Sequence, residues 1–270
     1  MFEKDKNDFD SVVQTKKKSK RISKILAVLI VVAAAVLGFY MCSEKLLIIK
    51  NIEVVNSETG EITQLPYTED ELMSFLGISK GMKLYEHSAS EMEMSAKYSL
   101  TYVKNLDVSR RWPSTVVLNV IPESPLYYVT IENNMYILSD ELKVIDVTGD
   151  VELVETNKLK LLRVASINQC IKGEKILIDK DIEEIILNIT SVLETENCLS
   201  DVTMINVTDK FGIELMYDTK YIVKLGDSKD LSNKIKMMNA IIKDKSEKIV
   251  SGTIDVTKDY GKTGTFKKFS

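Results

Sequence analysis

The stretch Val103–Pro122, VKNLDVSRRWPSTVVLNVIP, carries the clearest strand pattern in the chain. Within it, two segments of alternating apolar residues, Val103–Ser109 and Thr115–Ile121, flank a short loop that contains Pro113. Residues that alternate with a period of two lie on one face of a strand, and proline suits the second position of a turn. The sequence therefore predicts a β-hairpin with one buried face.

The segment before this hairpin predicts one strand and two short helices. Thr68–Glu71 and Ser88–Glu91 each place a hydroxyl residue three positions before a glutamate, which is the pattern of a helix capping box. Gly77 follows the apolar stripe of the first helix, where a left-handed C-terminal residue is favoured. With a strand over Ile48–Val55, the predicted order across residues 46–122 is β-α-α-β-β.

A second unit is predicted over residues 123–260. The boundary falls at Pro122–Pro125, because two prolines three apart do not fit inside a sheet ladder. Helices are expected to start at Asp181 and near Leu231, and the closing strand is expected at Thr253–Val256. Further strands are expected at residues 126–130, 135–138, 143–147, 159–164, 202–207, 213–217 and 221–225. Residues 261–270 are expected to form a short flexible tail.

Ile25–Cys42 is an uncharged apolar run that predicts a transmembrane helix. Eighteen residues in a helix span roughly 27 Å, which is just enough for a hydrocarbon core. Residues 1–24 hold eight Lys/Arg against four Asp/Glu, so the positive-inside rule puts this basic tail in the cytoplasm and residues after 42 outside. A cleavable signal peptide is the alternative, but the bulky residues of Phe39–Cys42 do not form the small-residue cleavage site that such a peptide needs. The expected fold class is α+β, with a single N-terminal transmembrane helix, a β-α-α-β-β domain and a mixed β-rich domain with flanking helices.

Composition and motifs argue against several kinds of function. The chain has a net charge of −4 although its first 24 residues are basic, so the rest is acidic and unsuited to nucleic acid. His87 is the only histidine and the three cysteines are widely spaced, which argues against a metal site and a disulfide framework. We expect no catalytic residue, no cofactor and no small-molecule substrate. The alternative is a membrane-anchored cell-wall-acting enzyme that uses carboxylates of the second unit.

Two segments are candidates for binding a partner protein. A closing strand at Thr253–Val256 would expose unpaired backbone groups if it lay at a sheet edge, and that edge would either be guarded by charge or accept a partner strand. At the tip of the hairpin, Arg110, Arg111 and Trp112 have two interpretations. They form a recruitment surface, or they form a tight turn in which Trp112 covers the core and arginine stacks nearby, and the second interpretation is favoured.

The ordered series of motifs resembles the FtsQ/DivIB cell-division proteins. The resemblance rests on Gly77–Gly81 followed by Leu84, and on the hairpin with its Arg-Trp-Pro turn. It continues through Tyr136–Asp140, Val144–Gly149, Tyr221–Gly226 and Thr253–Val256. That family has a basic tail, one anchor, a POTRA domain and a β domain. This chain departs from it where Glu123-Ser124-Pro125 lacks the arginine often found there, over residues 150–175, and in its short C-terminal tail.

The resemblance implies a non-enzymatic protein of the cell membrane and the division septum. Such a protein bridges single-pass partners of the FtsL and DivIC (or FtsB) type and helps to regulate septal peptidoglycan synthesis. In the family the partner adds to the edge of the β domain near its last strand. Carried over by position, the backbone-pairing residues are Thr253, Ile254, Asp255, Val256 and Thr257. Tyr260 and Phe266 are carried over as aromatic anchors.

Overall fold

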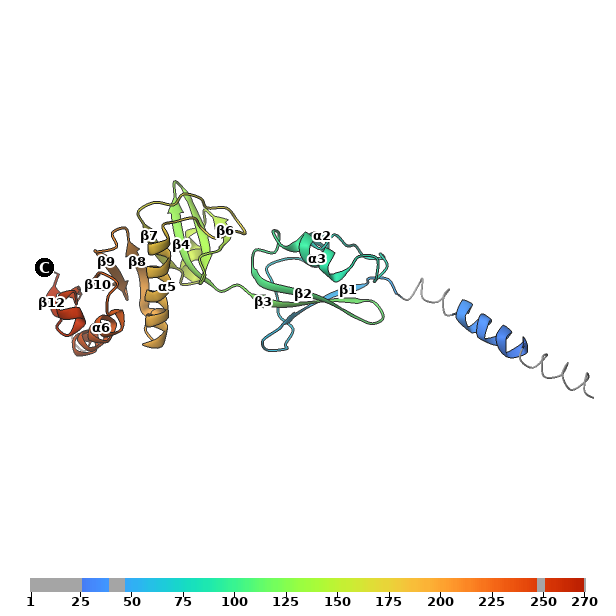
Figure 1. Cartoon of the computed structure of the whole chain (residues 1–270). Coiled ribbons are helices and arrows are strands. Elements are labelled where there is room, and N and C mark those ends of the chain that lie inside the picture. The colour runs from blue at the N-terminus through green and yellow to red at the C-terminus, as the bar shows by residue number, and fades with distance from the viewer. Residues whose placement is uncertain (1–25, 39–46, 247–250, 270) are drawn as a thin grey trace, which may run out of the picture.

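A computed structural model describes residues 26–38, 47–246 and 251–269. Its strands form two separate sheets, one of three strands and one of nine, which belong to two units joined near residues 122–125 (Figure 1). The described chain is therefore a mixed α/β protein with one large sheet.

The first unit has the predicted order of elements. It consists of β1 (Asn51–Asn56), α2 (Glu69–Phe75), α3 (Ala89–Ala96), β2 (Val103–Arg111) and β3 (Thr115–Pro122). The sheet order is β1-β3-β2, with β1 parallel to β3. Both predicted capping boxes are present, since Thr68 and Ser88 each accept from the amide three residues on and the glutamate reaches back.

The hairpin register explains the core of this unit. Leu106 pairs with Val120 and Val108 with Leu118, as the alternation predicted. Leu118 and Val120 are completely buried, and they belong to the same cluster as Met92 of α3. Burying such side chains stabilises the unit by roughly 1.5–3 kcal/mol each.

The second unit is built on the nine-stranded sheet. Its strands are β4 (Pro125–Ile131), β5 (Asn134–Ser139), β6 (Val144–Thr148), β7 (Lys160–Val164), β8 (Val202–Val207), β9 (Ile213–Tyr217), β10 (Tyr221–Gly226), β11 (Gly252–Asp255) and β12 (Thr265–Lys268). The helices are α4 (Val151–Thr156), α5 (Lys180–Thr195) and α6 (Leu231–Ser246), with 3-10 turns η1 (Leu199–Asp201) and η2 (Lys258–Gly261). The strand order is β12-β11-β10-β9-β8-β7-β4-β5-β6.

One apolar row crosses this sheet beneath α5 and α6. The register aligns the following residues on successive strands from β7 to β11: Leu162, Ile205, Leu215, Val223 and Ile254. All of them are buried in one cluster with Ile189 of α5 and Ile235 of α6. Both long helices therefore cover the same face of the sheet.

The sheet has a weak point between β4 and β7. These two strands pair in parallel only at Tyr127 with Lys160 and Tyr128 with Leu161. Beyond those pairs β4 continues to Ile131 and β7 continues to Val164 without a shared ladder. The nine strands therefore form two groups, β4-β5-β6 and β7 to β12, joined by a short seam.

The predicted fold class is wrong in its membrane helix. The apolar run forms a helix over the described residues 26–38. Among the residues that the structure describes, no helix is long and apolar enough to cross a membrane. The rest of the predicted span, Ile25 and residues 39–42, lies outside the described residues, as does the basic tail 1–24.

The prediction of a flexible C-terminal tail is also wrong. Residues 258–261 form η2 and Thr265–Lys268 form β12, which pairs with β11. Gly261 and Gly264 make this close packing possible, because a Cβ on either would lie within 2.6 Å of α6 atoms. At both positions the absence of a side chain therefore lets the chain approach α6 closely.

Candidate partner-binding edge

The strand predicted as an exposed edge is an interior strand. β11 pairs in parallel with β10 on one side and antiparallel with β12 on the other. Ile254 and Val256 are completely buried. β12 pairs with Thr253, Ile254 and Asp255, whereas the amide of Val256 donates to Lys224 O and that of Thr257 donates to Asp255 Oδ1. The prediction that these five residues offer free backbone groups to a partner is therefore wrong.

The end of the sheet is β12, and its register shows which way its backbone points. The amide of Phe269 donates to the carbonyl of Ser251 at 3.1 Å, so Ser251 and Phe269 form a hydrogen-bonded pair. Such pairs alternate along antiparallel strands, which places the N–H and C=O of Lys268 on the side away from β11. The side chains of Lys267 and Lys268 are exposed.

Phe266 fastens β12 to the sheet. Its ring lies 6.4 Å from the ring of Tyr221 in an edge-to-face arrangement, which is a favourable geometry for two aromatics. It also covers Gly252, where a Cβ would lie 2.6 Å from the Phe266 ring. Phe266 was predicted to anchor a partner, but it packs within its own sheet. The side chain of Tyr260, the other predicted anchor, lies outside the described residues.

Arg110, at the tip of the β2–β3 hairpin, stacks on a neighbouring ring as the tight-turn interpretation predicted. Arg110 Nε donates to Leu84 O at 2.8 Å, Arg110 also bonds to His87 O, and its guanidinium lies over the Tyr85 ring at 5.3 Å. Arg111 forms a 2.7 Å ion pair with Glu53. Trp112 precedes a cis proline and is 61% exposed, so the prediction that it covers the core is wrong.

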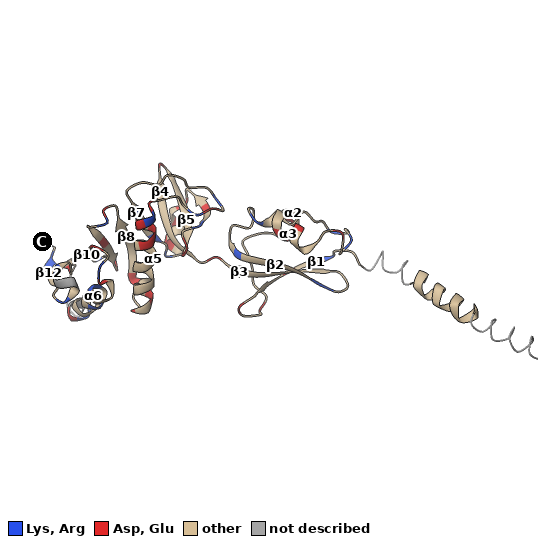
Figure 2. Ribbon diagram, viewed as in Figure 1, with Lys and Arg blue, Asp and Glu red and all other residues tan. Residues whose placement is uncertain are grey.

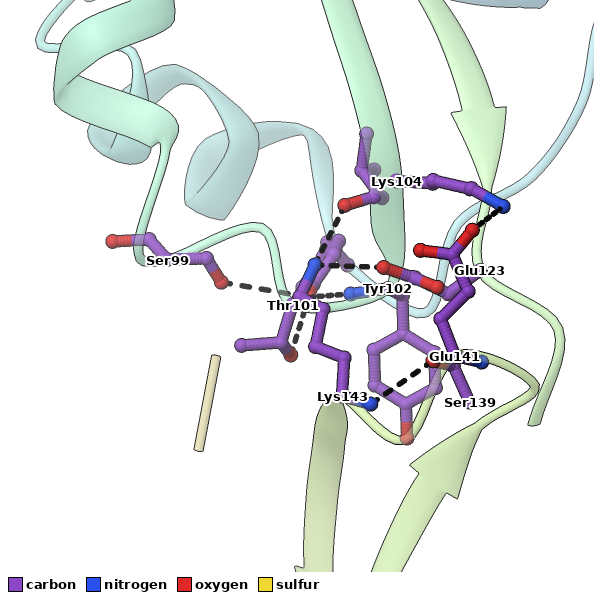
Figure 3. A network of polar contacts seen from close by, with 10 residues as sticks. Ser99, Thr101, Tyr102, Lys104, Glu123, Ser139, Glu141 and Lys143 are labelled. Atoms are coloured by element: carbon purple, nitrogen blue, oxygen red, sulfur yellow. Dashed lines mark hydrogen bonds and ion pairs between the residues drawn. The ribbon is translucent and has the colours of Figure 1, made fainter. Parts of the chain in front are cut away.

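A network of polar contacts joins the two units (Figure 3). Lys143, between β5 and β6, donates from Nζ to Val103 O and to Glu123 Oε1, each at 2.9 Å. Glu123 is buried, with a side chain only 4% exposed, whereas the side chain of Lys143 is 19% exposed. Lys104 and Glu141 form a second ion pair across the same junction at 2.7 Å, but both side chains are largely exposed.

A tyrosine extends this network into the second unit. Tyr102 donates its hydroxyl to Asp146 Oδ2 at 2.8 Å, and Lys172 bonds to the other oxygen of Asp146 at 2.6 Å. Burial and the bond to Asp146 raise the pKa of Tyr102. Burial acts to raise the pKa of Asp146, but the bonds from Lys172 and Tyr102 outweigh it, so that pKa is lowered. The junction therefore holds an ionised carboxylate between a lysine and a neutral tyrosine.

Charged residues are dispersed over the elements of both units (Figure 2). A shallow hollow of about 400 Å³ is lined by residues that include Asp181, Glu184 and Asp227. Asp181 is paired with Lys210 at 3.3 Å, and Asp227 binds buried Lys234 at 2.6 Å, which lowers the pKa of Asp227. Two of the three acids in this hollow thus have basic partners.

The described residues contain no group of three His, Cys, Asp or Glu side chains placed to hold a metal ion. Cys170 and Cys198 are both unpaired, and burial raises the pKa of the Cys170 thiol to about 11. A thiol with a raised pKa is a poor nucleophile at neutral pH. Cys198 lies in the core of the second unit, and Cys170 packs against that core.

Sequence reasoning missed β12 and Lys143. A four-residue strand with one apolar side chain gives almost no periodic signal, and a lysine in a short loop resembles any solvated lysine. No protein-family model matches this chain, and a search of curated proteins finds no similar sequence.

Proposed function

We propose that this protein is a non-enzymatic scaffold that binds an extended segment of another polypeptide along the outer side of β12. The observation that carries the proposal is the position of β12 as the last strand of the nine-stranded sheet, with the backbone of Lys268 directed outward. A terminal strand of this kind accepts a partner strand through main-chain hydrogen bonds. Lys267 and Lys268 favour a partner segment with acidic side chains.

The resemblance to the FtsQ/DivIB family gives the proposal its biological setting. A partner of the FtsL or DivIC (FtsB) type would pair with β12, and the protein would help to regulate septal peptidoglycan synthesis. The β-α-α-β-β order of the first unit supports this assignment. A fluorescent fusion is expected to be enriched at midcell, and an even distribution at all stages of division would argue against the division role.

The edge is tested by a proline at its outward-facing position. Lys268→Pro removes a donor that points away from β11, so the fold is expected to persist while co-purification of the FtsL- or DivIC-type partner is lost. Lys268→Ala keeps that donor and removes the same charge, which makes it the matched control. Equal partner binding by the proline and alanine variants, with both folded by circular dichroism, would refute pairing at β12.

A further inference from the structure

The seam between β4 and β7 opens into a cleft. The cavity has a volume of about 330 Å³ and lies where the two strands continue without a shared ladder. Val164 and Ile167 form half-buried apolar walls, and Thr130, Arg163 and Thr208 are exposed around them. An apolar cavity with a few polar groups at its rim is the usual form of a ligand site.

Arg163 gives this cleft a chemical preference. It is the only charged residue that lines the cavity, and it has no acidic partner among the residues that the structure describes. Its position within a strand, on β7, holds it beside the cavity. A guanidinium binds a carboxylate through two parallel hydrogen bonds, so the cleft favours a carboxylate over a neutral group.

The backbone of β4 also faces the cleft. β4 and β5 are joined by a two-residue turn between Ile131 and Asn134, which form the hydrogen-bonded closing pair of such a hairpin. The next pair, Thr130 with Met135, is therefore a non-hydrogen-bonded pair. The N–H and C=O of Thr130 then point away from β5 and toward the gap between β4 and β7. An extended chain entering the gap would find main-chain partners there.

From these three features we propose that the cleft binds the free C-terminus of an extended peptide. The terminal carboxylate pairs with Arg163, and the last side chain, an aliphatic one, lies against Val164 and Ile167. Both strands run toward the mouth of the cleft, so a peptide that enters with its C-terminus first lies antiparallel to them and pairs with Thr130. This site lies on a different strand pair from β12 and does not depend on strand addition there.

The test uses the full-length protein and a fluorescein-labelled hexapeptide that ends in Thr-Val-Val with a free carboxylate. Fluorescence anisotropy is expected to show binding that weakens by at least about tenfold, or 1.4 kcal/mol, when the same peptide is C-terminally amidated. Arg163→Gln is expected to cause a similar loss, whereas Lys224→Gln, which removes an exposed charge from β10 of the same sheet, leaves affinity unchanged. N-methylation of the penultimate residue is expected to weaken binding because it removes a ladder donor.

Several results would overturn the proposal. Equal affinity for the acid and amide peptides would exclude recognition of the terminus. Full binding of the N-methylated peptide, or equally effective competition by a short aliphatic acid such as hexanoate, would mean that the cleft does not pair with an extended chain. No measurable binding of the free-acid peptide to the folded protein would reject the site altogether.

Discussion

Replacing Lys143 by methionine tests whether the polar junction holds the two units together. Lys143 Nζ lies 2.9 Å from Glu123 Oε1, and the Glu123 side chain is only 4% exposed. At an effective dielectric constant of about 20, two unit charges at that separation attract by about 6 kcal/mol before desolvation is counted. Removing one partner leaves a buried carboxylate unpaired, which typically costs 3–5 kcal/mol. Because Lys143 retains some exposure, we expect a loss near the lower end, about 3 kcal/mol.

The measurement is the free energy of unfolding from urea denaturation, in a double-mutant cycle with Glu123→Met. The double variant is expected to lose only about 1 kcal/mol, since replacing both charges by apolar side chains leaves no carboxylate unpaired. Lys104→Met is the matched control. It also breaks an ion pair between the two units, at 2.7 Å, but its side chain is 40% exposed, so the cost should stay below about 1 kcal/mol. A loss from Lys143→Met no larger than that from Lys104→Met, or strictly additive losses in the cycle, would refute the reasoning.

Three further changes probe other parts of the molecule. Gly252→Val places a side chain where a Cβ would lie 2.4 Å from Lys267 O, so it is expected to lower the free energy of unfolding by about 1–3 kcal/mol and to release β12. Gly149→Val is the control, because a Cβ there meets nothing within 4 Å. Equal melting temperatures of the two variants would contradict the role of Gly252. Lys160 is 4% exposed and burial lowers its pKa, so Lys160→Met is expected to gain about 1 kcal/mol near pH 7. That gain should shrink as the pH rises from the folded toward the unfolded pKa, near 10.4, because the wild-type lysine is then neutral in both states; a gain that is independent of pH would argue against desolvation as the cause. Trp112→Ala is expected to change the unfolding free energy by less than about 0.5 kcal/mol, since Trp112 is 61% exposed. A loss of several kcal/mol would mean that Trp112 does contribute to the core.

Local signals in the sequence predicted local structure well. The alternation in Val103–Pro122 gave the register of β2 and β3, and the hydroxyl–glutamate spacing gave the caps of α2 and α3. These features depend on residues at most about 20 positions apart. Their physical causes, strand periodicity and helix capping, act within the segment that shows the pattern.

The errors arose where distant segments meet. Gly252 makes room for Phe266, which lies 14 positions later, and neither residue alone indicates a strand at Thr265–Lys268. Lys143 is half-buried only because the two units meet at it. Trp112 has the largest type of side chain, and such side chains are commonly expected to be buried. It is exposed here because it lies at the tip of a hairpin whose position is set by the pairing of the two flanking strands.

The last strand of the sheet is β12 and not β11 as predicted, which changes how the proposed partner would bind. If β11 had been the last strand, a partner would have had to take the place that β12 holds beside Thr253, Ile254 and Asp255. β12 already covers that side and is fastened by Phe266 against Tyr221, so the accepting strand is ordered before a partner arrives. Pre-ordering removes part of the entropy lost on binding, which allows a short extended segment to bind by backbone pairing. A partner that displaced β12 would first have to break the Phe266 contact and the β11–β12 ladder, so addition outside β12 is the less costly of the two routes.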